Sequence, residues 1–173
     1  MRLFIAINFN NDTINKLLAI RDDIRENSTG GNFSLPENLH LTLAFLGECT
    51  KQQADDVITA MDDIHLSPFS LTIDRIGRLR RDEGDIWWAG VQTSPPLLDL
   101  QNNIASKLEL IGFSLDNRKY SPHITLGRKV ATTASPNMII PFGETVTTFE
   151  LMKSERISGK LTYTVIHTTK VTD

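Results

Sequence analysis

Short segments in which apolar and polar residues alternate run through much of this chain, and a period of two is typical of strands. Bounded by turn residues, they predict strands over residues 2–9, 36–47, 69–79, 86–92, 122–127, 145–153 and 160–169. Apolar residues at helical spacing predict helices over residues 13–26, 51–64 and 97–111. Asn11 or Asp12 is the expected N-cap of the first helix, and Thr50 that of the second.

The order of these elements indicates the fold class. Residues 69–79 and 86–92 flank a short charged turn, which predicts a hairpin. A doubly wound parallel sheet has no such hairpins, so the pattern favours an α+β protein with two lobes, each built on a mostly antiparallel sheet. Glycines 30–31 are expected to end the first helical unit, and residues 132–141 to form a polar, proline-containing connection.

The strand predicted over residues 36–47, with the sequence PENLHLTLAFLG, carries the first candidate chemistry. Successive side chains of a strand point to opposite faces. The face predicted to lie on the core holds Leu41, Leu43 and Phe45. His40 and Thr42 then share the other face, two residues apart and pointing the same way.

The same unit recurs in the segment 122–127, PHITLG. Here Ile124 and Leu126 take the core face, and His123 and Thr125 take the open face. Strict alternation places Arg128 on the core face, away from these two side chains, whereas a twist or bulge at the strand end would bring it to a phosphate, so Arg128 is left unassigned. We expect each lobe to contribute one His-x-Thr strand to a shared cleft.

Two histidines in one cleft are suited to acid–base chemistry, because the unperturbed imidazole pKa lies near 6.5. A neutral His123 or His40 accepts a proton while its charged partner donates one. The hydroxyl groups of Thr42 and Thr125 are suited to donate hydrogen bonds to the oxygens of a phosphate or another oxyanion. The pair therefore predicts displacement at phosphorus without a metal.

The predicted hairpin carries two further features. Trp87 and Trp88 are adjacent and must face opposite sides of their strand, so one belongs to the core and the other to a surface or cleft. A basic cluster occupies the tip, with Arg78, Arg80 and Arg81. It is most simply a solvated turn, and its alternative role is a rim that attracts a polyanion.

Other residues allow competing interpretations. Histidine is a frequent metal ligand, but no Cys, Asp or Glu lies at ligand spacing from His40 or His123. His65 is expected in a surface loop, and His167 in a structural position within the last strand. Cys49 has no evident cationic neighbour that would lower its pKa, so we expect a bystander and not a nucleophile.

Composition limits the class of protein. The chain has 173 residues, with 40% hydrophobic and 23% charged side chains, which indicates one globular unit or two small lobes that share a core. No apolar run approaches the roughly 20 residues of a membrane helix, and the apolar start is expected to be a strand. The single cysteine favours a reducing cytoplasm. A net charge of −3 argues against non-specific coating of nucleic acid but allows recognition of one phosphate.

The two His-x-Thr units resemble those of the two-histidine (2H) phosphoesterase superfamily. More closely, the chain is similar to the RNA 2′,3′-cyclic phosphodiesterases of bacteria and archaea, also called 2′-5′ RNA ligase-like proteins. The shared segments are RLFIA at 2–6, PENLHLTLAFLG at 36–47, WAGV at 88–91 and PHITLGR at 122–128. The segment from Ser154 to Tyr163 also resembles the tail of this family, which has a Ser, a turn and a Tyr.

The resemblance implies a bilobal pseudo-twofold fold, with two mostly antiparallel sheets flanking a central groove and helices outside, as one catalytic domain over residues 1–173. It implies opening of an RNA 2′,3′-cyclic phosphate to a 2′-phosphate by a monomer without metal or cofactor. His40 would donate the proton to the departing 3′ oxygen, and His123 would activate water. Some members also join 2′-5′ linkages reversibly. A non-catalytic module that binds RNA ends and a hydrolase of another small cyclic phosphate remain alternatives.

Overall fold

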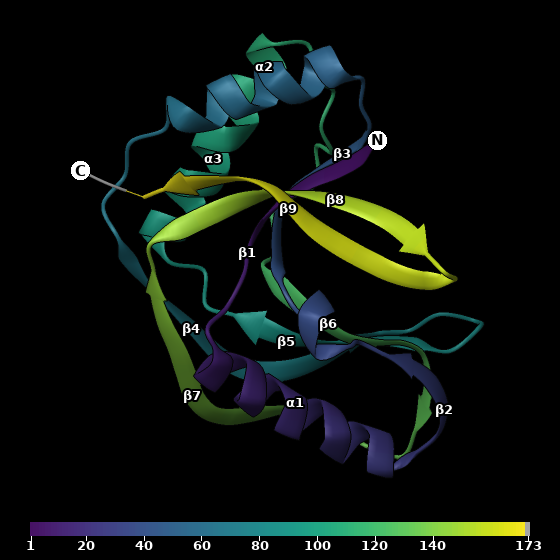
Figure 1. Cartoon of the computed structure of the whole chain (residues 1–173). Helices are drawn as coiled ribbons and strands as arrows, with labels where there is room; N and C mark the ends of the chain where they lie inside the picture. Colours follow the sequence, from purple (N-terminus) through teal and green to yellow (C-terminus); the bar gives the residue numbers. More distant parts are fainter. Residues whose placement is uncertain (172–173) are drawn as a thin grey trace.

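A computed structural model describes residues 1–171 of the chain (Figure 1). The helices are α1 (Asn11–Glu26), the short 3-10 helix η1 (Pro36–Asn38), α2 (Lys51–Asp62) and α3 (Pro95–Leu110). The strands are β1 (Arg2–Ile7), β2 (Ser28–Phe33), β3 (Leu41–Glu48), β4 (Phe69–Leu79), β5 (Asp85–Val91), β6 (His123–Thr132), β7 (Asn137–Val146), β8 (Thr148–Ile157) and β9 (Lys160–Lys170). Residues 172–173 of the predicted domain lie outside the described residues.

The strands form two sheets, with the orders β3-β1-β8-β9 and β2-β6-β5-β4-β7. Every strand pair recorded within residues 1–171 is antiparallel. In Figure 1 the sheets lie in the middle of the molecule, with α2 and α3 on one outer side and α1 on the other. The predicted α+β class is therefore confirmed, with β3 and β6 carrying one His-x-Thr unit in each sheet.

The helices begin at side-chain caps. Thr50 caps α2 as predicted, and its hydroxyl and the side chain of Gln53 form a reciprocal capping box. The prediction for α1 was wrong by one residue, because the side chain of Asn10 accepts the hydrogen bond from the backbone N–H of Thr13. Within residues 1–171, no helix is both long enough and apolar enough to cross a membrane.

Both sheets contribute to one hydrophobic core. Ile5 and Leu41 of one sheet belong to the same cluster of buried side chains as Trp87 and Ile124 of the other. A second, small cluster contains Phe4, Ala6 and Met152, with Tyr163 packed against it. Because Phe4 and Ala6 alternate with the core residues of β1, this second cluster lies on the opposite face of the four-stranded sheet.

Two predicted connections are strands. Glycines 30–31 lie in β2, and most of the connection predicted over residues 132–141 lies in β7. Both strands occupy the edges of the five-stranded sheet, where side chains are largely exposed and alternation is weak. An edge position also tolerates Pro141 within β7. The pairing partners, and not the local sequence, determine these strands.

The prediction that Phe45 faces the core is wrong. Ala6 of β1 pairs with Thr42, but the preceding residue, Ile5, pairs with Ala44, so Leu43 is an extra residue on β3. This β-bulge reverses the alternation after Leu43. Leu41 and Leu43 are buried as predicted, whereas Phe45 is 54% exposed on the face of Thr42.

The bulge gives a matched pair of stability predictions. Leu43→Ala should lower the free energy of unfolding by about 2–5 kcal/mol, because it leaves a cavity in the core. Phe45→Ala should lower it by less than about 1 kcal/mol, because an exposed ring loses little burial. Equilibrium unfolding in urea measures both. Equal losses would place Phe45 in the core and contradict the bulge.

Candidate active site

A groove of about 1100 Å³ is lined by residues from both sheets. The four side chains predicted from the sequence, His40, Thr42, His123 and Thr125, all line it. The wall also includes Phe4, Tyr163, Phe45 and Arg128. The fold therefore brings the two His-x-Thr units together from strands of different sheets.

His40 is partly buried against two aromatic rings that also contact each other. Its ring centroid is 4.9 Å from that of Phe4 and 5.2 Å from that of Tyr163. Its Nδ1 atom lies 2.8 Å from the backbone oxygen of Asn38, and its Nε2 atom lies 3.0 Å from the hydroxyl of Thr42. The imidazole is therefore held at both nitrogen atoms and packed against an aromatic pair.

His123 has the same anchor but a more open environment. Its Nδ1 atom lies 2.7 Å from the backbone oxygen of Ser121, and the side chain is exposed. Its ring centroid is 6.1 Å from that of Trp88. In each unit, the carbonyl that anchors the ring thus belongs to the residue two positions upstream.

The anchors determine the tautomer of both rings. A carbonyl oxygen only accepts hydrogen bonds, so Nδ1 of His40 and of His123 must carry the proton. In the neutral ring, Nε2 is then the basic atom, and in the charged ring it is the acid that remains available. The site can therefore hold one base and one acid, each acting through Nε2.

The protein favours the neutral form of His40. Burial lowers the pKa of His40, and the nearby charges of Arg128 and His123 lower it further, while the hydrogen bond to the carbonyl of Asn38 acts in the opposite direction. A negatively charged ligand in the groove would raise the pKa of His40, because it stabilises the imidazolium.

The strand β6 has a bulge at the position equivalent to that in β3. Thr125 pairs with Trp88, but the preceding residue of β5, Trp87, pairs with Gly127, so Leu126 is the extra residue. The alternation reverses there, and Arg128 lines the groove instead of facing the core. Of the two placements open for Arg128, strict alternation is therefore wrong and the bulged strand end is confirmed. The sequence carries no signal of either bulge.

Two hydroxyl groups hold the backbone of the two threonines, and that of Tyr120 does so across the two sheets. The hydroxyl of Tyr120, just before the second unit, donates to the backbone oxygen of Thr42 over 2.8 Å. The hydroxyl of Ser34, before the first unit, donates to the backbone oxygen of Thr125 over 2.9 Å. Burial raises the pKa of Tyr120, so its hydroxyl keeps its proton. These bonds fix the two threonines relative to each other.

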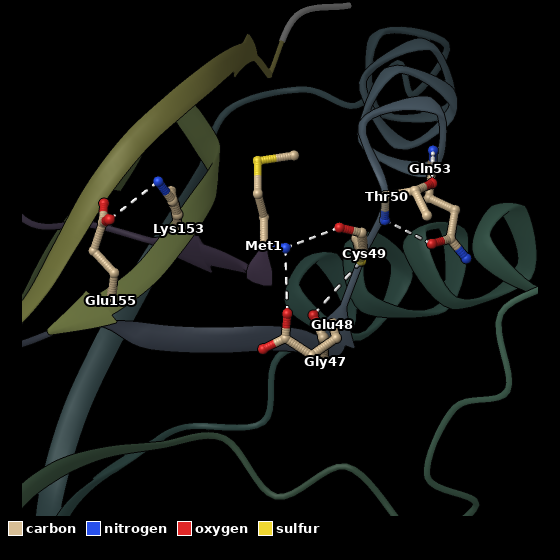
Figure 2. A network of polar contacts seen from close by, with 8 residues as sticks. All are labelled: Met1, Gly47, Glu48, Cys49, Thr50, Gln53, Lys153 and Glu155. Atoms are coloured by element: carbon tan, nitrogen blue, oxygen red, sulfur yellow. Dashed lines mark hydrogen bonds and ion pairs between the residues drawn. The ribbon is translucent and has the colours of Figure 1, made fainter.

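The charges at one end of the groove are largely paired. Figure 2 shows the amino group of Met1 donating to the carbonyl of Cys49 over 3.0 Å, with the carboxylate of Glu48 at 3.2 Å. Lys153 and Glu155 form a second pair, at 3.1 Å. In contrast, no carboxylate within residues 1–171 forms an ion pair with Arg128. Its charge is therefore available to a ligand.

The other candidates lie away from the groove. His65 is exposed in a loop, and His167 contacts the carboxylate of Asp62 at 2.7 Å, which links β9 to α2. Burial raises the pKa of the Cys49 thiol, which opposes its action as a nucleophile. In the described part of the chain, no three His, Cys, Asp or Glu side chains come together as a metal site.

Comparisons with known proteins identify the family. A family model described as LigT like phosphoesterase matches residues 7–88. The RNA 2′,3′-cyclic phosphodiesterase of Thermotoga maritima is 32% identical over 131 residues, which cover 74% of this chain and 70% of the relative. The protein of the same name from Escherichia coli (strain K12) is 33% identical over 130 residues, with 74% and 73% covered. The chain belongs to the LigT-like phosphoesterases.

Solved structures of LigT-like phosphoesterases share the whole fold. A crystal structure described as a phosphoesterase has a TM-score of 0.87 and 30% identity, with 99% of this chain and 98% of that chain covered. The structure of E. coli LigT complexed with 3′-AMP has a TM-score of 0.85 and 28% identity, with the same coverage. The bilobal fold that the sequence resemblance implied is confirmed.

The environment of His40 predicts the pKa of its imidazole. In the free protein, the pKa of His40 should lie below 6.5, because burial disfavours the imidazolium. Arg128→Gln should raise that pKa, since it removes a nearby positive charge. NMR titration of the imidazole signals measures both values, with His40→Ala to assign the resonance. A pKa at or above 6.5 in the wild-type protein would contradict the described environment.

Proposed function

We propose that this chain is a metal-independent RNA 2′,3′-cyclic phosphodiesterase that leaves a 2′-phosphate, acting as a monomer with one catalytic domain. The observation that carries the proposal is the pair of imidazoles, His40 and His123, in one groove with Nδ1 of each held by a backbone carbonyl and Nε2 of His40 beside the hydroxyl of Thr42. The names of the curated relatives support the substrate class. The nucleotide in the E. coli LigT complex supports nucleotide binding to this fold.

The proposed reaction is an in-line displacement. Nε2 of His123 takes a proton from water, and the water oxygen attacks phosphorus from that side. The bond between phosphorus and the 3′ oxygen breaks, and this oxygen takes the proton from Nε2 of a charged His40. The phosphate stays on the 2′ oxygen, and the two histidines end with exchanged protonation states.

The bound phosphate resolves a conflict in this assignment. An acid must be charged before it reacts, yet burial lowers the pKa of His40 in the free protein. The cyclic diester carries one negative charge, which favours the imidazolium in the complex. Thr42 and Thr125 would donate hydrogen bonds to the non-bridging oxygens, and Arg128 would supply a positive charge at the same groove.

The same geometry also allows a hydroxyl group of RNA to take the place of water as the attacking group. A 5′-hydroxyl that replaces water on the His123 side would give a 2′-5′ linkage, with identical proton transfers. Hydrolysis and joining would then differ only in the group that supplies the attacking oxygen.

An end-labelled RNA oligonucleotide with a terminal 2′,3′-cyclic phosphate tests the proposal directly. We expect the purified protein to convert it to the 2′-phosphate, equally with and without EDTA, because the proposed proton transfers need only His40 and His123. Chromatography against 2′- and 3′-phosphate standards identifies the product. An unchanged end in both reactions would refute the phosphodiesterase proposal, and loss of activity with EDTA alone would refute the metal-free mechanism. A 3′-phosphate product would exchange the roles of the two histidines.

Single substitutions test the assigned roles. His40→Ala and His123→Ala should each lower kcat by roughly 10²–10⁴-fold, the usual contribution of one general acid or base. The double variant should be much less than multiplicatively worse, because the two groups act as a unit. Thr42→Ala and Thr125→Ala should lower kcat by roughly 10²-fold, as the loss of one oxyanion donor does.

His65→Ala is the matched control, since His65 is exposed in a loop and lies outside the groove. All variants should keep the far-UV circular dichroism of the wild type, because the substituted side chains are not in the core. Wild-type turnover in His123→Ala would remove that residue from the mechanism.

A further inference from the structure

Trp88 lies beside His123 on the outer side of the site. It pairs directly with Thr125 across β5 and β6, so both side chains point to the same face of the five-stranded sheet. Trp87 is fully buried, but Trp88 is only partly buried. The ring of Trp88 is the aromatic neighbour of His123, whereas Phe4 and Tyr163 pack against His40.

Two glycines leave room on the sheet for the side chains of Trp88 and Arg75. A Cβ atom at Gly77 of β4 would lie only 2.1 Å from the indole of Trp88, so the ring covers the backbone of β4 at that point. A Cβ atom at Gly90 of β5 would lie 2.6 Å from the side chain of Arg75, which therefore crosses β5 there. Gly90 pairs with His123 on its other side, so Arg75 and His123 flank the same glycine.

Arg75 is held in place but is not fully covered. Its guanidinium contacts the carboxylate of Asp74 at 3.0 Å, and Gln92 donates to the other oxygen of that carboxylate over 3.0 Å. The guanidinium carbon lies 6.0 Å from the ring of Trp88, and the side chain is 34% exposed. An indole and an adjacent cation, both partly open to solvent, form a surface on which nucleobases stack.

The position of this surface suggests which nucleoside it binds. Trp88 and Arg75 lie outside the groove wall, next to the histidine that would serve the attacking oxygen. When the base of a nucleoside stacks on Trp88, its ribose places the 5′ oxygen near His123. We propose that Trp88 and Arg75 form an acceptor subsite for a nucleoside whose 5′-hydroxyl replaces water, an inference that rests on the proposed function.

The joining step balances without any further reactant. The 5′ oxygen attacks phosphorus and gives its proton to Nε2 of His123. The bond from phosphorus to the 3′ oxygen breaks, and that oxygen takes a proton from Nε2 of His40. Trp88 binds the base of the acceptor, and Arg75 binds a phosphate on its 3′ side.

Partition between water and an added acceptor tests the subsite. A dinucleotide with a 2′,3′-cyclic phosphate end is incubated with adenosine or with adenosine 3′-phosphate, and joined and hydrolysed products are quantified. Trp88→Ala should lower the ratio of joined to hydrolysed product roughly 5- to 100-fold, the range expected from loss of one stacked base. Hydrolysis without acceptor is measured in parallel, and the joined product should fall more than the hydrolysed product. Trp88→Phe should keep most of the ratio, because an aromatic face remains.

The same assay tests the positive charge of Arg75 and a control substitution. Arg75→Gln should lower the joined fraction with adenosine 3′-phosphate more than with adenosine. Ile140→Ala is the matched control, since Ile140 is 90% exposed on the neighbouring strand β7 of the same sheet. It should leave the ratio unchanged.

The outcomes separate this inference from the proposed function. Hydrolysis by the wild type with no joined product, or an unchanged ratio in Trp88→Ala, would overturn the subsite alone. Equal loss of hydrolysis and joining in Trp88→Ala would assign the indole to the cyclic nucleotide, which also overturns it. Absence of hydrolysis by the wild type would instead refute the phosphodiesterase proposal on which the subsite rests.

Discussion

The hydrogen bond from Nδ1 of each histidine to the carbonyl two residues upstream is the constraint on which the site depends. The bond fixes one tautomer and one ring orientation for His40 and for His123. It needs a backbone that turns just before each strand, which η1 supplies for His40 and the loop through Ser121 for His123. Without this bond, either nitrogen could carry the proton, and the two Nε2 atoms would not be available together.

The two rings are anchored alike but placed in different environments. His40 packs against Phe4 and Tyr163, which belong to the small apolar cluster on the groove face of its sheet. His123 is exposed and has Trp88 beside it. Desolvation therefore acts on one imidazole far more than on the other. Because burial lowers the pKa of His40, the acid role proposed for His40 also requires the negative charge of a bound phosphate.

The two bulges show how tertiary pairing extends the site. An extra residue at Leu43 and at Leu126 reverses the alternation of β3 and β6 at equivalent positions. Phe45 and Arg128 then join the groove wall, one as an exposed ring and the other as a cation without an ion pair among residues 1–171. The shared core and the hydroxyl of Tyr120 hold the two strands relative to each other.

The sequence by itself determined the helices, the hairpin of β4 and β5, and the four side chains of the repeated units. These features follow from periodicity and from local chemistry, which neighbouring residues carry. It did not determine the edge strands β2 and β7, because exposed edges show little alternation and form only where a partner strand lies beside them. Nor did it determine the faces of Phe45 and Arg128. A bulge depends on the register against the neighbouring strand, and the register is a property of the pair and not of either sequence alone.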